Sequence, residues 1–352
     1  MAGQLGWRRW IVLGLLPTCA CAAAPTCLVL SGAAPEPLLS AVLALLAAPG
    51  RLGGVDVMLL ERGVACLPRV PVPYRSAADA RESVYPRLAA AARAAEVPLG
   101  VGLELLRYGP HAPPPMPAWI ELGWPQQPPV APRGEAYLSP FHPAVSAAID
   151  GVVDAVSALA PRPARVVLDY RLPADELLGF STAARVACIR GLSQDAIDLF
   201  FETDLQLWLG WRGRALAERF GQITRRVREK LPGVPVVARV TGAYHTLKVG
   251  RREWSGDNWL AWLADGLCDE VLLDAQWNLG VAADEFLLLK RFAQERGQAE
   301  PLARMRVLVR TRGDDGKLAL TPQLKFLESR GATPDRLVYC PMQAEDLDAI
   351  PR

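Results

Sequence analysis

The stretch Ala164–Pro173, with the sequence ARVVLDYRLP, places a run of apolar β-forming residues directly before a charged side chain. Val166–Leu168 carry no polar side-chain atoms, which is typical of a strand buried on both faces of a parallel sheet. The run ends at Asp169, and Pro173 follows shortly, where the chain can no longer pair as a central strand. A buried strand that ends on a carboxylate predicts an opening in the fold, and Asp169 is the side chain that we expect to reach it.

Seven further apolar runs recur along the chain, separated by longer segments rich in alanine and leucine. The eight runs are TCLVLS from Thr26, VDVMLLE from Val55, PLGVGLELL from Pro98, ARVVLDY from Ala164, VPVVARV from Val234, DEVLLDAQW from Asp269, RVLVRTR from Arg306 and RLVYCPM from Arg336. The segments between them show helical periodicity, as in Leu216, Phe220, Ile223, Val227 and Leu231. This alternation predicts a parallel sheet. Eight strands predict a closed (β/α)8 barrel of the TIM type, formed as a single domain by residues 25–352.

An open, doubly wound sheet is the alternative α/β fold. That fold usually carries a glycine-rich phosphate-binding loop after one of its strands, and none of the eight runs is followed by one. The strand count and the missing loop favour the barrel. They also lead us to expect no nucleotide cofactor.

The composition is that of a globular protein without a strongly charged surface. Of 352 residues, 51% are hydrophobic and 22% are charged, which is enough apolar material for one large core. The 39 basic and 37 acidic residues are spread along the chain and leave a net charge of +2. We therefore expect no nucleic-acid partner and no electrostatic binding to an anionic membrane.

Residues 1–24 resemble an export signal. Arg8 and Arg9 supply a short basic region, an apolar stretch begins at Ile11, and small residues near Ala22 permit cleavage. We expect the mature chain to start between Ala22 and Thr26, and the protein to act in the periplasm or outside the cell.

Two other readings of this segment stay open. One is an uncleaved anchor helix, which Pro17 and the shortness of the apolar run disfavour. The other is a lipid attached to Cys19 or Cys21. The membrane is expected to be a partner only through such an anchor.

The cysteines and histidines do not suggest a metal site. Five cysteines follow the signal segment, and they are far apart, odd in number and mostly set in apolar runs, which argues against a dense disulfide framework. The three histidines, His111, His142 and His245, include no pair at helical spacing. We expect the cysteines to be buried apolar residues and no metal to be bound.

Charged residues recur where the predicted strands end. They are Glu61, Glu104, Asp169, Arg239, Asp274, Arg310 and Arg312. Because the carboxyl ends of barrel strands meet at one face, these charges are expected to ring a single opening, where such barrels build active sites. Structural ion pairs are the alternative role for any one of them. Carboxylate pairs are also what glycoside hydrolysis needs, one to protonate the leaving oxygen and the other as nucleophile or base.

Tryptophans are frequent, with ten in the chain. Trp119 and Trp124 lie in the proline-rich segment that follows the third predicted strand, where exposed indole rings could stack on sugar rings. Trp259 and Trp262 are three residues apart in a helical segment, a spacing more typical of core packing.

Four motifs occur in a recognisable order between Ala136 and Trp277. They are AYLSPFHPAVSAAIDGVVDAVS from Ala136, VVLDYRLP from Val166, WLGWRGRALAERFGQITRRVREKLPGVPVVARV from Trp208 and DNWLAWLADGLCDEVLLDAQW from Asp257. In this order they resemble the bacterial family called glycosyl hydrolase-like 10. The resemblance covers this segment well and the flanking strands loosely.

The resemblance implies a barrel, export and activity on carbohydrate. The matching positions are Asp169 and Tyr170 for the family's D-Y pair, Arg171 for its arginine, Trp208, Trp211 and Arg212 for its W-x-x-W-R motif, Asp257, Trp259 and Trp262 for its D-W-x-x-W region, and Asp269 for its later aspartate. Two departures touch the expected site. DYRLP is one residue shorter than the family's DYIRYP, and VLLDAQW replaces a strand end that usually reads Pro-Met or Pro-Gln followed by tyrosine.

We therefore predict a glycoside hydrolase that acts on an extracellular or envelope polysaccharide. Asp169 is expected to be one catalytic carboxylate, with Asp274 or Glu104 as its partner. The residues expected to bind substrate are Glu61, Trp119, Trp124, Tyr170, Arg171, Trp208, Trp211, Arg212, Arg239, Gln276 and Trp277.

Two other functions fit the same residues. A saccharide-binding barrel without catalysis would keep the tryptophans and lack a suitably spaced acid pair. A deacetylase or lyase is the weaker alternative, because deacetylases usually need a histidine and aspartate metal site. The distance between the two carboxyl groups distinguishes a hydrolase from a binding protein. A separation of about 5 to 5.5 Å suits a retaining hydrolase, about 6.5 to 9.5 Å suits an inverting one, and no pair in either range would favour binding alone.

Overall fold

The computed structural model describes residues 26–350 with several gaps. The gaps are residues 49, 68–69, 77–83, 110–116, 124–135, 173–177, 203, 241–258, 275–283, 285, 288–289, 292–293, 295–299, 313–316, 318, 331 and 334–335. The predicted signal segment and three predicted site residues, Trp124, Gln276 and Trp277, lie outside the described residues.

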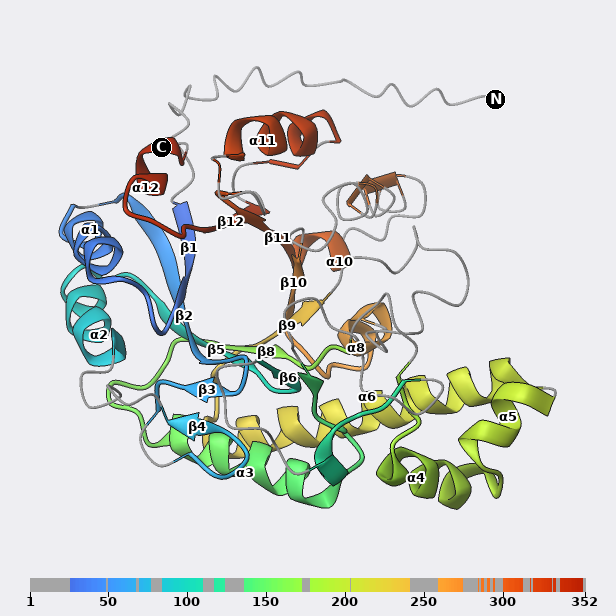
Figure 1. Ribbon diagram of the computed structural model, residues 1–352. Helices are drawn as coiled ribbons and strands as arrows, with labels where there is room; N and C mark the ends of the chain where they lie inside the picture. The colour runs from blue at the N-terminus through green and yellow to red at the C-terminus, as the bar shows by residue number, and fades with distance from the viewer. Residues whose placement is uncertain are drawn as a thin grey trace, which may run out of the picture.

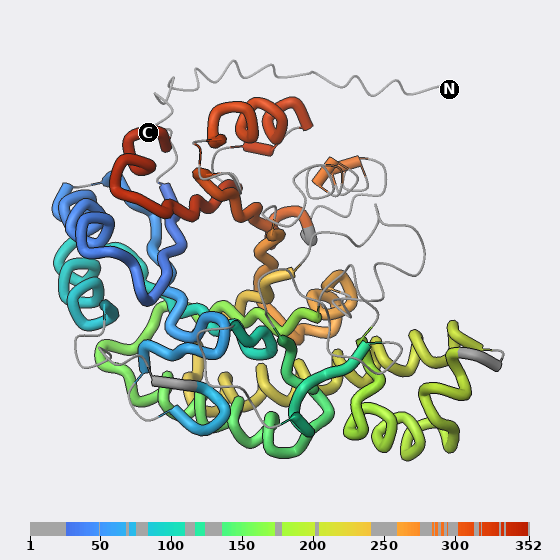
Figure 2. Tube along the Cα trace, in the orientation of Figure 1, coloured from blue at the N-terminus to red at the C-terminus, as the bar shows by residue number. Residues whose placement is uncertain are grey.

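Eight parallel strands form a closed barrel (Figure 1). They are β1 (Thr26–Ser31), β2 (Leu52–Glu61), β5 (Leu99–Glu104), β8 (Val166–Asp169), β9 (Val236–Val240), β10 (Glu270–Asp274), β11 (Met305–Arg310) and β12 (Leu337–Cys340). Neighbours in this order pair with each other, and β1 pairs with both β2 and β12. The first described strand, blue, therefore lies beside the last, red (Figure 2). The predicted barrel is confirmed, with one strand in each of the eight predicted runs.

Helices surround the barrel (Figure 1). They include α1 (Glu36–Leu46), α2 (Val84–Ala94), α3 (Pro143–Ser157), α6 (Leu205–Lys230), α8 (Trp259–Ala264), α10 (Glu300–Ala303), α11 (Leu320–Ser329) and α12 (Asp346–Ala349). The predicted apolar stripe of α6 is buried. It faces the barrel and belongs to the outer core, the apolar layer between the strands and the surrounding helices. None of the described helices is both long and apolar enough to cross a membrane.

Several smaller elements extend this plan. The connection between β8 and α6 adds α4 (Thr182–Leu192) and α5 (Ala196–Glu202), which pack beside the first half of α6 away from the barrel (Figure 1). The others are β3 (Val64–Ala65), β4 (Arg75–Ser76), β6 (Arg107–Tyr108), the 3-10 helix η2 (Pro117–Trp119) and β7 (Ala136–Tyr137). The last three belong to the proline-rich segment between β5 and α3.

The middle of the barrel is filled by one layer of apolar side chains. Seven strands each give one buried residue: Val29, Met58, Val167, Val237, Leu272, Leu308 and Val338. The eighth strand, β5, has Gly102 opposite Met58, and a Cβ at Gly102 would overlap the Met58 sulfur. The neighbouring strand residues, such as Val166 and Leu168, belong instead to the outer core under the helices, as the two-residue period of a strand requires.

An ion pair fills the amino-terminal end of the barrel. Arg165 donates two hydrogen bonds to Asp56, at 2.7 and 2.8 Å, and Asp56 is 2% exposed. Gly100 makes room for this pair, because a Cβ there would overlap Asp56 Oδ1 and lie 2.6 Å from Arg165 Cγ. A structural ion pair therefore occupies this end, whereas sites in such barrels are built at the carboxyl ends of the strands.

Candidate active site

A layer of polar side chains follows the apolar layer at the carboxyl ends of the strands. One inward position further along each strand stand Ser31, Glu61, Glu104, Asp169, Arg239, Asp274, Arg310 and Cys340. Three of these residues form a row across adjacent strands, since Glu104 pairs in register with Asp169, and Asp169 with Arg239. Six of the seven strand-end charges predicted from the sequence therefore belong to one layer.

Glu61 reaches this layer through a bulge in β2. The register between β2 and β5 shifts between Met58 and Leu60, so that Met58 faces the barrel interior while Leu59 and Leu60 both join the outer core. The extra residue turns Glu61 inward, where its Oε2 accepts a hydrogen bond of 2.7 Å from Ser31 Oγ.

Arg312, the seventh predicted charge, has another role. Its Nε donates a 2.7 Å hydrogen bond to Asp346, the first residue of α12. Asp346 has no exposed surface and also accepts hydrogen bonds from the Thr311 hydroxyl and two backbone amides. This ion pair anchors the end of the chain to β11.

Arg171 joins the two candidate catalytic aspartates. Its guanidinium forms a bidentate pair with Asp169, at 2.7 and 2.6 Å, and the same Nη2 contacts Asp274 Oδ2 at 2.9 Å. Both Oδ2 atoms contact the same Nη2, at 2.6 and 2.9 Å, so the two Oδ2 atoms are at most about 5.5 Å apart. The predicted carboxylate pair is close together, and Asp169 and Asp274 are 3% and 4% exposed.

Arg239 supports the same pair from β9. It contacts Asp274 Oδ2 through Nη2 at 2.8 Å and lies 3.6 Å from Asp169 Oδ2. Burial acts to raise the pKa of Asp169, but the positive charge and hydrogen bonds of Arg171, with Arg239 behind, outweigh it and lower the pKa. Asp169 is thus held ionised.

Glu104 has the opposite electrostatic environment. Its carboxylate is 4% exposed, accepts a 2.8 Å hydrogen bond from the backbone amide of Arg62 and lies 3.3 Å from Arg107. Burial raises its pKa, the negative charge of Asp169 adds to the effect, and Arg107 offsets only part of it. Neighbouring carboxyl groups whose pKa values are driven apart are the arrangement of an acid and a base.

Three residues expected to bind substrate are instead buried elsewhere. Tyr170 follows Asp169 on the outer side of the barrel and packs against Phe220, with ring centroids 6.2 Å apart. Trp208 is fully buried, stacked on Phe180 in the core shared by α4, α5 and α6. Arg212, also fully buried, lies over the Trp208 ring. Burial lowers its pKa to about 10. None of these three side chains belongs to the strand-end layer, and their expected contact with substrate stays a prediction.

The other described tryptophans divide between core and surface. Trp259 and Trp262 are buried, as their spacing predicted. Trp119 is half-buried beside His142, with ring centroids 5.8 Å apart. Trp211 stacks on Phe141 in a groove outside the barrel that no strand-end residue lines. Trp211 is therefore separate from the carboxylate layer.

Two contributors to the site were missed in the sequence. Arg107 follows β5 by three residues and pairs with Glu104. Ser31 ends β1 and bonds Glu61. The signal for both was available: each stands at or just beyond the end of a predicted strand, where side chains point to the same opening.

Metal-binding groups are not assembled in the described part of the chain. No cluster of three histidine, cysteine, aspartate or glutamate side chains there could hold a metal ion. The five cysteines among the described residues are free thiols, three of them buried, Cys66, Cys188 and Cys268, and two half-buried, Cys27 and Cys340.

Comparisons with known proteins show the fold. No protein-family model matches the chain, and no curated protein sequence does. The glycoside hydrolase domain of PgaB (BpsB) from Bordetella bronchiseptica aligns with a TM-score of 0.64 and 19% identity over 91% of this chain and 95% of that one. Two β-galactosidases align with TM-scores of 0.56 and 0.51: that of Rahnella sp. R3, 12% identical over 89% of this chain, and that of Bacillus circulans sp. alkalophilus, 11% identical over 90%. This chain spans half the length of each. The chain thus has a (β/α)8 barrel whose structural neighbours are glycoside hydrolases.

Proposed function

We propose that the protein is a glycoside hydrolase whose acid and base are Glu104 and Asp169. The observation that carries this proposal is the divergence of their pKa values: two carboxylates, paired in register on adjacent strands, are shifted in opposite directions. The pKa of Glu104 is raised and that of Asp169 is lowered, which matches the acid and base roles that glycosidic bond cleavage requires.

In this mechanism Glu104 protonates the oxygen of the leaving sugar while Asp169 acts on the anomeric carbon. Register partners on adjacent strands are about 4.8 Å apart at Cα, which favours the short carboxyl separation of a retaining enzyme. Asp169 would then form the glycosyl–enzyme bond, and a water deprotonated by Glu104 would break it, restoring both groups. Arg171 and Arg239 would hold Asp169 in place, and substrate binding would shift Arg171 from the carboxylate that attacks.

The substrate we propose is a polysaccharide outside the cytoplasm. The support is the predicted export signal in residues 1–24, together with the motif resemblance between Ala136 and Trp277 to the glycosyl hydrolase-like 10 family. The glycoside hydrolase neighbours support the same reaction class. We propose that the chain belongs to that family and is released, or held at the envelope by a lipid or an uncleaved anchor.

The test compares three isosteric variants in an assay of reducing ends released from a panel of polysaccharides. Asp169→Asn and Glu104→Gln should each lower turnover by about 10² or more, because acid–base and nucleophilic roles contribute at least that much. Asp274→Asn is the matched control, since Asp274 is equally buried and binds the same two arginines.

All three variants should lose about 1 to 3 kcal/mol of stability from the broken hydrogen bonds. Turnover that falls as far in Asp274→Asn as in Asp169→Asn would make Asp274 the partner of Asp169. Full activity in stable Asp169→Asn would refute the mechanism.

A saccharide-binding barrel without catalysis is the second candidate. One observation favours it: both aspartates are already engaged by arginines, as in a purely structural ion cluster. Binding of an oligosaccharide without any release of reducing ends, in wild type and variants alike, would decide for this alternative.

A further inference from the structure

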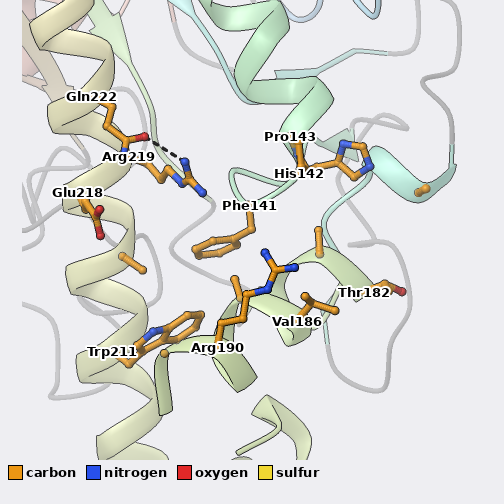
Figure 3. Close-up of a pocket in the computed structure, with 15 residues that line it drawn as sticks. Phe141, His142, Pro143, Thr182, Val186, Arg190, Trp211, Glu218, Arg219 and Gln222 are labelled. Atoms are coloured by element: carbon orange, nitrogen blue, oxygen red, sulfur yellow. Dashed lines mark hydrogen bonds between the residues drawn. The ribbon is translucent and has the colours of Figure 1, made fainter. Parts of the chain in front are cut away.

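We propose that a groove on the outside of the barrel, between α3, α4 and α6, is a second saccharide-binding site. The groove has a volume of about 620 Å³, within the range of roughly 300 to 1,000 Å³ typical of ligand sites. It is lined by residues from the start of α3, the length of α4 and the middle of α6 (Figure 3). None of the strand-end residues is among them.

The floor of the groove carries two aromatic rings. Phe141 and Trp211 stack with ring centroids 5.7 Å apart and planes 19° from parallel. Gly191 lets α4 pack directly against Trp211, since a Cβ there would overlap the indole nitrogen. Alanines of α4 and α6 line the hollow beside this contact. Phe141 is only 6% exposed and supports the half-buried Trp211 from below, so the indole is the ring that can meet the apolar face of a pyranose.

Planar polar side chains edge the groove. Arg190, Glu218, Arg219 and Gln222 extend around the aromatic pair (Figure 3). Arg219 donates a 3.0 Å hydrogen bond to Gln222, whereas Arg190 and Glu218 make no hydrogen bond or ion pair with any residue that the structure describes. Fork-shaped donors and acceptors match the adjacent hydroxyls of a sugar. Two arginines against one glutamate disfavour a cationic polymer, and Glu218 would repel a polyanion, so an uncharged polymer is the best match.

The walls of the groove are fixed before any ligand arrives. Glu121, which has no exposed surface, accepts hydrogen bonds from Ser139 Oγ at 2.7 Å and from the backbone amide of Ser181 at 2.9 Å. Ser139 lies just before α3, and Ser181 is the N-cap of α4. Arg212 on α6 interacts electrostatically with the same carboxylate. One buried group thereby ties together the three helices that form the groove.

The groove opens toward the face of the barrel that carries the carboxylates. A helix that follows a barrel strand begins at the end where the strand finishes, so the His142 end of the groove lies at that face. Ala118 of η2 lines this end, and its neighbour Trp119 contacts His142. A polysaccharide lying across the strand ends could continue along η2 into the groove. The ligand class rests on the proposed function, whereas the groove itself does not.

The experiment measures binding by biolayer interferometry, with immobilised uncharged hexasaccharides of glucose, N-acetylglucosamine and galactose, and with chitosan and alginate as charged probes. The test variant is Arg190→Ala/Glu218→Ala, whose side chains are exposed and whose loss should not affect folding. The matched control is Arg214→Ala/Glu229→Ala, which removes the same charges from exposed positions of α6 outside the groove. Each pair is made in wild type and in Asp169→Asn. Trp211→Ala, checked by its melting temperature, tests the aromatic floor.

At least one uncharged hexasaccharide should bind, and the groove variant should weaken its binding fivefold or more in both backgrounds while the control does not. The inference is overturned if no uncharged hexasaccharide binds, if groove and control variants bind alike, or if the groove variant only abolishes binding to chitosan, to alginate or to a second copy of the chain. If the protein cleaves polysaccharide but the groove variant binds as the control does, only the second binding site is refuted. If binding depends on the groove but no polysaccharide is cleaved, only the hydrolase proposal is refuted.

Discussion

At the scale of single residues, burial and two arginines together determine the pKa values of the two carboxylates. Arg171 lowers the pKa of Asp169 against the effect of burial. Arg107 opposes the raised pKa of Glu104 without cancelling it. A hydrolase that needs Asp169 ionised and Glu104 protonated has an activity limited at low pH by the first group and at high pH by the second.

Removing each arginine should therefore move a different limb of the pH–rate profile. Arg171→Ala takes away a charge that favours the ionised form of Asp169, so its pKa rises and the low-pH limb moves to higher pH. Arg107→Ala does the same for Glu104, so the high-pH limb moves to higher pH. The measurement is kcat/KM against pH for both variants and wild type. Limbs that stay in place in both variants would contradict the assignment of acid and base.

Asp346 gives a residue-scale prediction about stability. It is fully buried, and its carboxylate accepts hydrogen bonds from Thr311, Arg312 and the amides of Met342 and Gln343. An amide accepts with only one of its two groups, so Asp346→Asn should cost about 2 to 4 kcal/mol. The exposed Asp348→Asn in the same helix is the control and should cost far less.

The pH dependence of this effect follows from the lowered pKa of Asp346. Burial acts to raise this pKa, but the hydrogen bonds of Thr311, the two amides and Arg312 lower it below the unfolded value of 3.8. The stabilisation is therefore present above about pH 4 and is lost as pH falls through the folded pKa. Urea unfolding at pH 7 and at pH 3 should show wild type and Asp346→Asn converging at the lower pH. If the difference in unfolding free energy between wild type and Asp346→Asn is the same at both pH values, the charge of Asp346 does not stabilise the fold.

At the scale of elements, the strands could be predicted from the sequence and the faces of the helices could not. Runs such as Val166–Leu168 are apolar on both sides, so the barrel strand follows from the sequence. Which side faces inward does not: Asp169 and Tyr170 are both expected in the site, and the two-residue period turns Tyr170 to the outer core. Trp208 and Arg212 have no such constraint. Their motif spacing places them on one face of a helix. That face is covered by α4 and α5, two helices that a plain alternation of strands and helices does not include. The β2 bulge that turns Glu61 inward has no signature in the residues either.

Glycines in the barrel wall carry an element-scale prediction. Gly100→Ala would push a methyl group into the Asp56–Arg165 pair, whose bidentate geometry leaves no room to yield. The cost should be about 1 to 3 kcal/mol. Gly213→Ala on α6 is the matched control, because nothing lies within 4 Å of its Cβ position. It should stabilise by about 0.5 to 1 kcal/mol, since glycine is unfavourable within a helix. The measurement is the melting temperature of both variants. If both melting temperatures move in the same direction, Gly100 is not needed to make room for the Asp56–Arg165 pair.

At the scale of the whole molecule, the barrel is closed by the first strand of the folded chain. β1 pairs with β2 on one side and β12 on the other, from Thr26 to Ser31. Leu28 and Leu30 belong to the outer core and Val29 to the inner layer. Signal cleavage is compatible with this fold only if it spares β1, and the predicted start between Ala22 and Thr26 meets that condition.

Two measurements test this last prediction together. N-terminal sequencing of the protein from its native envelope should give a first residue between Ala22 and Thr26, and intact Met1 on most molecules would contradict cleavage. A chain that begins at Pro25 should melt at the temperature of the full-length chain, because no strand residue is lost. A chain that begins at Gly32 should unfold at a much lower temperature, since both neighbouring strands lose a partner and the barrel gains two open edges. Equal melting of the two shortened chains would show that β1 does not close the barrel.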